Sequence, residues 1–145
     1  MASANVELVR SIYSAWERDD YSSVQWAHPE IEFAMADGPD PGSWTGVDGM
    51  VEGWRAFKSM WEDFRAEVAE YRDLDAEHVL VLARFHGRAK LSGLDLAQMG
   101  TQQASLFQIR AGMVTRLVLY WHSDRAFADL GLSPEGGPTK RPPGS

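Results

Sequence analysis

The hydrophobic pattern of this 145-residue chain changes its period close to residue 65. Between residues 47 and 64, behind a capping-box-like start at Thr45, large apolar side chains recur at helical spacing. They are Met50, Trp54, Phe57, Trp61 and Phe64. From residue 66 onward, apolar and polar side chains alternate, which is the pattern of half-buried strands. The chain is therefore expected to pack a long aromatic helix against a sheet.

The same patterns, together with turn residues, set the limits of the predicted elements. Helices are predicted over residues 5–18, 21–27, 47–64 and 123–130, and strands over 31–35, 66–75, 78–91, 99–110 and 113–123. Asn5 is the expected N-cap of the first helix and Gly131 the C-cap of the last. His28-Pro29 ends the second helix, because the residue before a proline avoids the helical region.

The order of these elements predicts an α+β fold. Strands that follow one another this closely are normally antiparallel neighbours. The antiparallel sheet must curl around the long helix, with the N-terminal helices beside it, to cover the aromatic stripe. Residues 133–145 hold four of the seven prolines and no large apolar side chain. We expect them to be a disordered tail behind a single domain over residues 1–132.

Charge and cysteine content exclude several classes of function. The chain has 14 basic and 21 acidic residues, a net charge of −7, which argues against a nucleic-acid or anionic membrane partner. The absence of cysteine excludes disulfides, thiol nucleophiles and thiolate zinc sites. No stretch approaches the ~18 apolar residues that a membrane span needs, and the start shows no signal-peptide pattern. A cytoplasmic protein is expected.

Five segments carry a family resemblance. They are NVELVRSIYSAW, HPEIEF, TGVDGMVEGW, IRAGMVTRL and YWHSDRAFADLGL. With the order of elements, they resemble the SnoaL-like branch of the NTF2-like superfamily over residues 5–132. The resemblance implies a cone-shaped α+β barrel with one deep apolar pocket, usually in a homodimer. The family includes polyketide cyclases, ketosteroid isomerases and limonene-epoxide-hydrolase-like enzymes, so the fold does not decide the reaction.

The strand over residues 79–90 carries the first catalytic candidates. Alternation places Arg84 and His86 on one face, and Val79, Val81 and Phe85 on the other. The resemblance implies that Arg84-Phe85-His86 stands where epoxide hydrolases of the family carry an Arg-x-Asp pair. If this face points into the cone, Arg84 orients a substrate oxygen and His86 transfers a proton. If it points to solvent or to a dimer interface, both are ordinary polar surface residues.

The end of the last strand carries the second set of candidates. The resemblance to epoxide hydrolases implies a catalytic carboxylate at Asp124. The resemblance to cyclases places their aspartate at Trp121 or His122, depending on the register. The alternatives are that Asp124 is only the N-cap of the last helix and that His122 is an exposed strand-end residue.

The ketosteroid isomerase mechanism fits this sequence poorly. The resemblance aligns its general base with Ala34 and its tyrosine with Ile12, beside Tyr13. Its second acid falls near Ser105. Asp37 can replace the base only if the loop after the first strand folds back over the mouth of the cone.

Aromatic side chains are expected to form the wall of the pocket. The resemblance favours an inward face for Leu117, Leu119 and Trp121 on the last strand. The expected ligand-binding residues are Tyr13, Trp16, Phe33, Met35, Trp54, Phe107, Leu119, Tyr120 and Trp121. Many rings and few charges suit a flat apolar ligand, although the same rings can simply form a core. The four histidines show no metal-ligand spacing, so no metal or cofactor is expected.

Two functions are consistent with these patterns. One is a cofactor-independent enzyme that applies general acid–base chemistry to a small apolar carbonyl or epoxide compound. Its polar residues would be Arg84, His86, Asp124 and His122. The alternative is a non-catalytic dimeric protein that binds a hydrophobic small molecule. A buried carboxylate in contact with histidine or arginine favours the enzyme, and an all-apolar cavity favours the binding protein.

Overall fold

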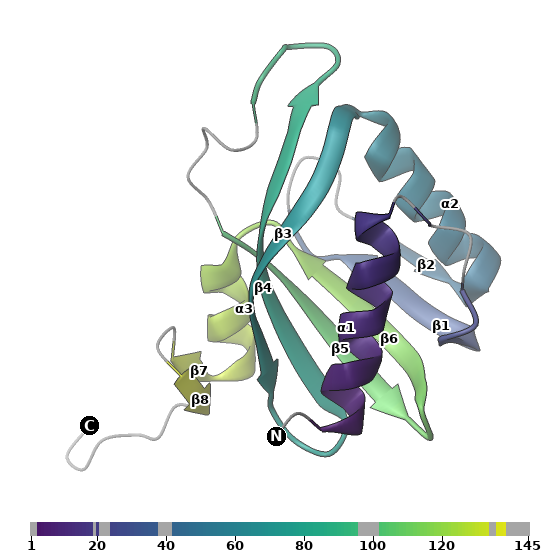
Figure 1. Cartoon of the computed structure of the whole chain (residues 1–145), viewed down its shortest axis with the longest axis vertical. Coiled ribbons are helices and arrows are strands. Elements are labelled where there is room, and N and C mark those ends of the chain that lie inside the picture. The colour runs from purple at the N-terminus through teal and green to yellow at the C-terminus, as the bar shows by residue number, and fades with distance from the viewer. Residues whose placement is uncertain are drawn as a thin grey trace.

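The computed structural model describes residues 3–18, 20, 24–37, 42–95, 102–133 and 136–138. The helices within these ranges are α1 (Ala4–Glu17), α2 (Gly46–Ser59) and α3 (Ser123–Leu130). The strands are β1 (Ala27–Met35), β2 (Gly42–Thr45), β3 (Trp61–Asp73), β4 (His78–Ala89), β5 (Gln103–Arg110), β6 (Met113–Tyr120), β7 (Leu132–Ser133) and β8 (Gly136–Pro138) (Figure 1).

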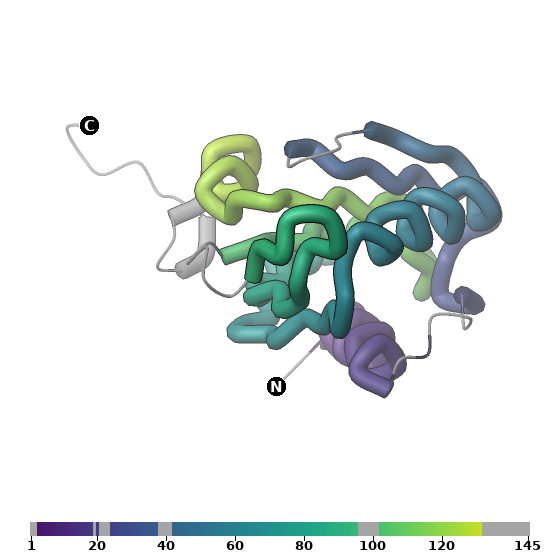
Figure 2. Tube along the Cα trace, turned by 90° about the horizontal axis from the view of Figure 1, so that it is seen from above, coloured from purple at the N-terminus to yellow at the C-terminus, as the bar shows by residue number. Residues whose placement is uncertain are grey.

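Six of the strands form one curved sheet in the order β2-β1-β6-β5-β4-β3, which is not closed. α1 and α2 lie on one face of the sheet, and α3 lies on the other (Figure 1, Figure 2). The predicted cone-shaped α+β architecture is confirmed. One correction concerns strand direction: the sheet is mixed, because β1 runs parallel to β6 while the other neighbouring pairs are antiparallel.

Each face of the sheet has its own hydrophobic cluster. The inner cluster, under α1 and α2, includes Val79, Val81, Phe85, Leu117, Leu119 and Trp121. The outer cluster, under α3, includes Leu80, Leu82, Val118, Tyr120, Ala126 and Phe127. The alternation predicted for β4 and for β6 is therefore confirmed. The inward face predicted for Leu117, Leu119 and Trp121 is confirmed as well.

The aromatic stripe predicted as one helix is divided between α2 and β3. α2 ends at Ser59, and Trp61 begins β3, yet both Trp61 and Phe64 pack against the inner cluster. Two strand residues separated by three positions normally face opposite ways. Here the β3–β4 register shifts near Asp63, which has a φ of 53°, and this bulge returns Phe64 to the inner side. The helix prediction is wrong beyond Ser59 because a bulged strand imitates helical spacing.

Three predictions near the N-terminus also need correction. Ser3, not Asn5, caps α1: its hydroxyl accepts the Val6 N–H at 3.1 Å. The helix predicted over 21–27 is not seen in its described part, residues 24–27, where a turn leads into β1; residues 21–23 lie outside the described residues. β1 begins at Ala27 because the residue before Pro29 favours extended backbone. The four-residue β2 has no predicted counterpart.

The C-terminal elements agree more closely with prediction. α3 has the predicted limits, and Gly131 caps it with a φ of 67° in the left-handed region. Within the predicted tail, β8 pairs with β7. Residues 134–135 and 139–145 lie outside the described residues, so the disordered tail stays a prediction.

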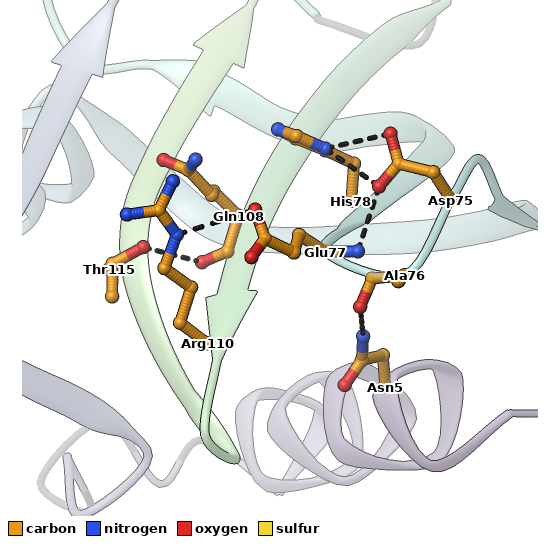
Figure 3. Close-up of polar contacts among 8 residues, drawn as sticks. All are labelled: Asn5, Asp75, Ala76, Glu77, His78, Gln108, Arg110 and Thr115. Atoms are coloured by element: carbon orange, nitrogen blue, oxygen red, sulfur yellow. Dashed lines mark hydrogen bonds and ion pairs between the residues drawn. The ribbon is translucent and has the colours of Figure 1, made fainter.

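Polar side chains join α1, the turn between β3 and β4, and β5 (Figure 3). This turn cluster consists of Asn5, Asp75, Glu77, His78 and Arg110. Asn5 Nδ2 donates to the carbonyl of residue 76 at 2.8 Å, and Arg110 Nε donates to Glu77 Oε1 at 3.3 Å. Asp75 Oδ1 accepts the Glu77 N–H at 2.7 Å, and both Asp75 oxygens lie within 3.0 Å of His78 Nδ1. These bonds, the one from Glu77 N–H above all, hold the pKa of Asp75 below its ordinary value.

Candidate functional site

A cavity of about 390 Å³ lies between α1, α2 and the adjoining part of the sheet. It is lined by Trp16, Val24, Trp26, Phe33, Met50, Val51, Trp54, Arg55, Lys58 and Leu117. α2 contributes half of these residues, at a spacing that turns one side of the helix toward the space. The volume falls within the ~300–1,000 Å³ range of ordinary small-molecule pockets.

Four of the ten residues that line this cavity are aromatic. Trp16 and Trp54 stack with their ring centroids 5.2 Å apart and their planes inclined by 28°. Trp26 meets Trp16 edge to face at 6.3 Å, and Phe33 meets Trp54 in the same way at 6.2 Å. Stacked and edge-to-face geometries are those that aromatic groups prefer. A flat ligand can therefore continue the packing that the wall already has.

Deeper in the inner cluster, rings fill the space instead of lining it. The Phe57 ring lies 5.3–6.3 Å, between centroids, from the rings of Trp54, Trp61, Phe64, Phe85 and Trp121. Only small voids of about 20 Å³ and about 10 Å³ are found in this region of the described chain. The aromatic residues of the cone thus do both things that the sequence left open: some line a cavity and others form a core.

Tyr13 and Ser105 form a buried polar pair beside the larger of these voids. The Tyr13 hydroxyl donates to Ser105 Oγ at 3.0 Å. Burial raises the pKa of Tyr13 well above its ordinary value, because the buried site disfavours the charged phenolate. Trp16 and Trp54 border both this void and the main cavity. A hydroxyl donor is therefore placed directly behind the aromatic wall.

Asp37, two residues after β1, borders the smaller void together with Phe57 and Phe85. Its Oδ1 accepts the Trp121 N–H at 2.5 Å. Its Oδ2 is buried and has no hydrogen-bond partner among the described residues. Asp37 itself thus folds back against the cone, while residues 38–41 lie outside the described residues. Burying a carboxylate oxygen without a partner is costly, and such groups concentrate at functional sites.

The candidates predicted on β4 and after β6 lie away from this cavity. Arg84 is exposed, on the face of β4 that also carries Leu80 and Leu82, and His86 Nε2 lies 3.2 Å from Glu67 Oε1. This face of β4 therefore points away from the cone, and the opposite face carries Val79, Val81 and Phe85 into it. The catalytic roles predicted for Arg84 and His86 stay predictions.

His122 and Asp124, at the start of α3, are also exposed. His122 is the N-cap of α3 and makes no side-chain capping bond, and Asp124 lies in the first turn. Asp124 is not the N-cap, as the alternative prediction had it: α3 begins at Ser123, so the N-cap is His122 and Asp124 is the second residue of the helix. Neither residue lines a pocket in the described part of the chain. Their catalytic roles stay predictions too.

The predicted ligand-binding residues divide by location. Trp16, Phe33 and Trp54 line the cavity, Tyr13, Met35, Leu119 and Trp121 line the small voids, and Phe107 is fully buried. Tyr120 belongs to the outer cluster, although it borders the smaller void, and burial together with Asp129 raises its pKa. Arg55 and Lys58 are absent from the predicted set, yet Arg55 follows Val51 and Lys58 follows Trp54 by four positions, which places both on the side of α2 that lines the cavity.

Clustered metal ligands and membrane-spanning helices are both absent from the described residues. The described residues contain no group of three or more His, Cys, Asp or Glu side chains placed to hold a metal ion. In the same part of the chain, no helix has the length and apolar character of a membrane span.

Similar solved structures support the fold. A "putative polyketide cyclase" from Sinorhizobium meliloti is 22% identical, with a TM-score of 0.60, and the match covers 78% of this chain and 93% of that one. An NTF2-like protein from Burkholderia thailandensis is 20% identical, with a TM-score of 0.69, covering 82% and 90%. TerC, crystallised with polyporic acid, is 19% identical, with a TM-score of 0.66, covering 88% and 98%. At these identities, the similarity shows a common fold.

Sequence comparison identifies the family directly. A search among curated proteins finds no match. The family model of the SnoaL-like domain matches residues 9–117, which is most of the chain and includes all of the described residues that line the cavity. The chain therefore belongs to the SnoaL-like family.

Proposed function

We propose that this protein binds a flat, largely apolar small molecule in the cavity between α1 and α2. The observation that carries the proposal is the stacked pair Trp16 and Trp54, which borders about 390 Å³ of space, whereas the rings around Phe57 pack closely against one another. Aromatic residues that served only as core would pack into this volume, as they do around Phe57.

The family supports the same assignment at a coarser level. This chain matches the SnoaL-like family and shares its fold with a putative polyketide cyclase. Both observations support a role in small-molecule binding, cyclisation or isomerisation. TerC, which was crystallised with polyporic acid, shares the fold. A flat ligand with several rings is consistent with the aromatic wall of the cavity.

Isothermal titration calorimetry with 2-naphthamide tests the proposal. The wild-type protein is expected to bind this neutral two-ring probe. Val51→Trp fills the cavity and is expected to weaken binding at least roughly tenfold, because the probe loses most of its contact area. Leu91→Trp adds the same ring at a fully exposed position and is expected to change nothing.

Circular dichroism and thermal melting check that the Val51→Trp variant is folded, with Val51→Phe as a smaller filling variant. If naphthamide does not bind the wild type, or if the folded filling variants bind it as well as the wild type does, the cavity is not the binding site.

A second candidate function is general acid–base catalysis on an apolar carbonyl or epoxide compound. The observation that favours it is the buried oxygen of Asp37 that has no partner among the described residues and can accept a proton. It lies near a second void bordered by Ser105, whose hydroxyl accepts the Tyr13 proton and can donate its own to a developing oxyanion. Trp54 and Phe57 stack at 5.4 Å in the inner cluster, so a substrate would need these rings to turn aside.

Turnover of a panel of β-keto and epoxide compounds tests this candidate. Asp37→Asn is expected to lower kcat by roughly 10²–10⁴ while leaving naphthamide binding intact. Asp124→Asn is the matched control, because it makes the same chemical change at an exposed carboxylate. The opposite result, loss of activity only in Asp124→Asn, would move the site to α3 and restore the role predicted from the resemblance.

The homodimer and the cytoplasmic location are further proposals that the resemblance supports. The exposed outer side of β3 and β4, around Arg84 and His86, offers a surface for the dimer. Sedimentation equilibrium measures the mass, and a monomer at micromolar concentration would contradict the proposal.

A further inference from the structure

The charged residues around the cavity are all of one sign. Among its described lining residues, only Arg55 and Lys58 carry charge, and both are cations. They lie three positions apart on α2, one turn from each other on the same side of the helix. Arg55 is exposed and Lys58 is half-buried, and both line the cavity as well as the open recess beside it.

Carboxylates appear only further out, at the opening. An open recess of about 640 Å³ adjoins the cavity and shares Trp16, Arg55 and Lys58 with it. The recess adds Arg65 and two carboxylates, Glu17 and Asp63. Among the described residues, the cavity wall therefore holds cations and no carboxylate, although the whole chain carries a net charge of −7.

The position of Lys58 in the last turn of α2 has an ordinary explanation, since cations stabilise a helix C-terminus. That effect is confined to the last turn and does not require a cation on the cavity side. Arg55 lies one turn earlier, at a position where a neutral or acidic residue would serve the helix equally well. Its guanidinium has the fork geometry that pairs with a carboxylate through two hydrogen bonds.

We infer that the ligand of this cavity is an apolar carboxylic acid whose flat body lies against Trp16 and Trp54 and whose carboxylate meets Arg55 and Lys58. This inference rests on the proposed binding function and adds the chemical class of the ligand. The rings account for affinity toward the body of the molecule, and the two cations account for discrimination between an acid and its neutral analogue.

A matched pair of probes, 2-naphthoate and 2-naphthamide, tests the inference by calorimetry on the full chain. The two molecules have nearly the same shape and differ in charge. The wild type is expected to bind the acid roughly tenfold more tightly than the amide. Added salt should weaken binding of the acid and leave the amide unchanged, because the cations are partly exposed.

The double variant Arg55→Gln/Lys58→Gln is expected to remove the preference for the acid while binding the amide within about twofold of the wild type. Glutamine keeps a high helix propensity, so α2 should be retained. Arg88→Gln/Lys90→Gln is the control: it removes two positive charges from exposed positions outside the cavity and should preserve the preference.

The outcomes separate the two proposals. If the amide binds but the acid binds no more tightly, the inference is wrong and the binding function stands. If the control double variant loses the preference to the same degree, long-range charge rather than Arg55 and Lys58 is responsible, and the inference is again wrong. If neither probe binds the wild type, the binding function itself fails.

Discussion

Two aspartates in different regions of the molecule have opposite surroundings. Asp75, in the turn cluster, is exposed, and both of its oxygens have partners in Glu77 N–H or His78 Nδ1 (Figure 3). Asp37, beside the inner cluster, has one oxygen bonded to Trp121 N–H and one buried oxygen with no partner among the described residues.

Folded proteins usually show the reverse arrangement. Buried polar groups are almost always hydrogen-bonded, whereas exposed ones can rely on water. A buried group left unsatisfied costs about 1–3 kcal/mol of stability. Stability explains the bonds of Asp75 and does not explain the second oxygen of Asp37. The bonds of the turn cluster therefore stabilise the fold, whereas the second oxygen of Asp37 adds no such bond among the described residues.

The largest expected effect tests whether rings, rather than polar groups, hold the interior together. Phe57→Ala is expected to lower the free energy of unfolding by about 3–5 kcal/mol, because it removes the ring on which five others converge. Urea denaturation followed by circular dichroism measures the change. Phe127→Ala removes the same ring from the smaller outer cluster. If Phe127→Ala lowers the free energy of unfolding more than Phe57→Ala does, the inner rings are not the main source of stability.

The next effect separates the two oxygens of Asp37. Asp37→Ala leaves the Trp121 N–H without its acceptor and is expected to cost about 1–3 kcal/mol. Asp37→Asn keeps an acceptor for that N–H while removing the charge, and its stability should stay within about 1 kcal/mol of the wild type. If Asn is as damaging as Ala, the charge of Asp37 is itself stabilising and the contrast with Asp75 disappears.

A smaller, pH-dependent effect is expected at Asp75. Because its pKa is lowered in the folded state, ionised Asp75 stabilises the protein above the unfolded pKa of about 3.9. That contribution is lost as the pH falls through the lowered folded pKa. Asp75→Asn should therefore cost less than about 1 kcal/mol at pH 7, since the site is exposed, and nothing in strong acid. A difference from the wild type that persists unchanged in acid would show that ionisation of Asp75 plays no part.

The smallest effect concerns the link between α1 and the turn cluster. Asn5→Ala removes the bond to the carbonyl of residue 76 and is expected to cost about 0.5–1 kcal/mol. Ser11→Ala is a control on the same helix, because its hydroxyl bonds only to the Leu8 carbonyl three residues back. Thermal melting compares the two. If both substitutions lower the melting temperature equally, the bond from Asn5 to the turn contributes no more than a bond within α1.

Local pattern was enough to predict most of the elements. The alternation in β4 and β6 and the periodicity of α1 are properties of a few neighbouring residues, and both are confirmed. Alternation divides β4 into two faces, but the neighbours in space decide which face is inside. For that reason, the sequence predicts that Arg84 and His86 share one face of β4 but does not predict whether that face points into the cone.

The features that sequence could not predict depend on distant contacts. The bulge near Asp63 places Phe64 on the inner face of a strand, where helical spacing predicts a continued helix. Asp37 has no periodic neighbours, and only its bond to Trp121 N–H, 84 positions away, shows where it lies. Helical spacing links Arg55 to Val51 and Lys58 to Trp54, four positions apart in each case. Cations on the solvent side of a helix are common, so this spacing alone does not indicate a site.

The parallel pairing of β1 with β6 has a consequence for the order of events during synthesis. Phe33 of β1 pairs directly with Leu117 of β6, and both line the cavity. A chain emerging from the ribosome therefore carries β1 and the aromatic side of α2 without their partner until β6 has been made. The ability to hold a ligand arises only in the last part of translation. Until then, the unpaired edge of β1 is the segment most open to association with other chains.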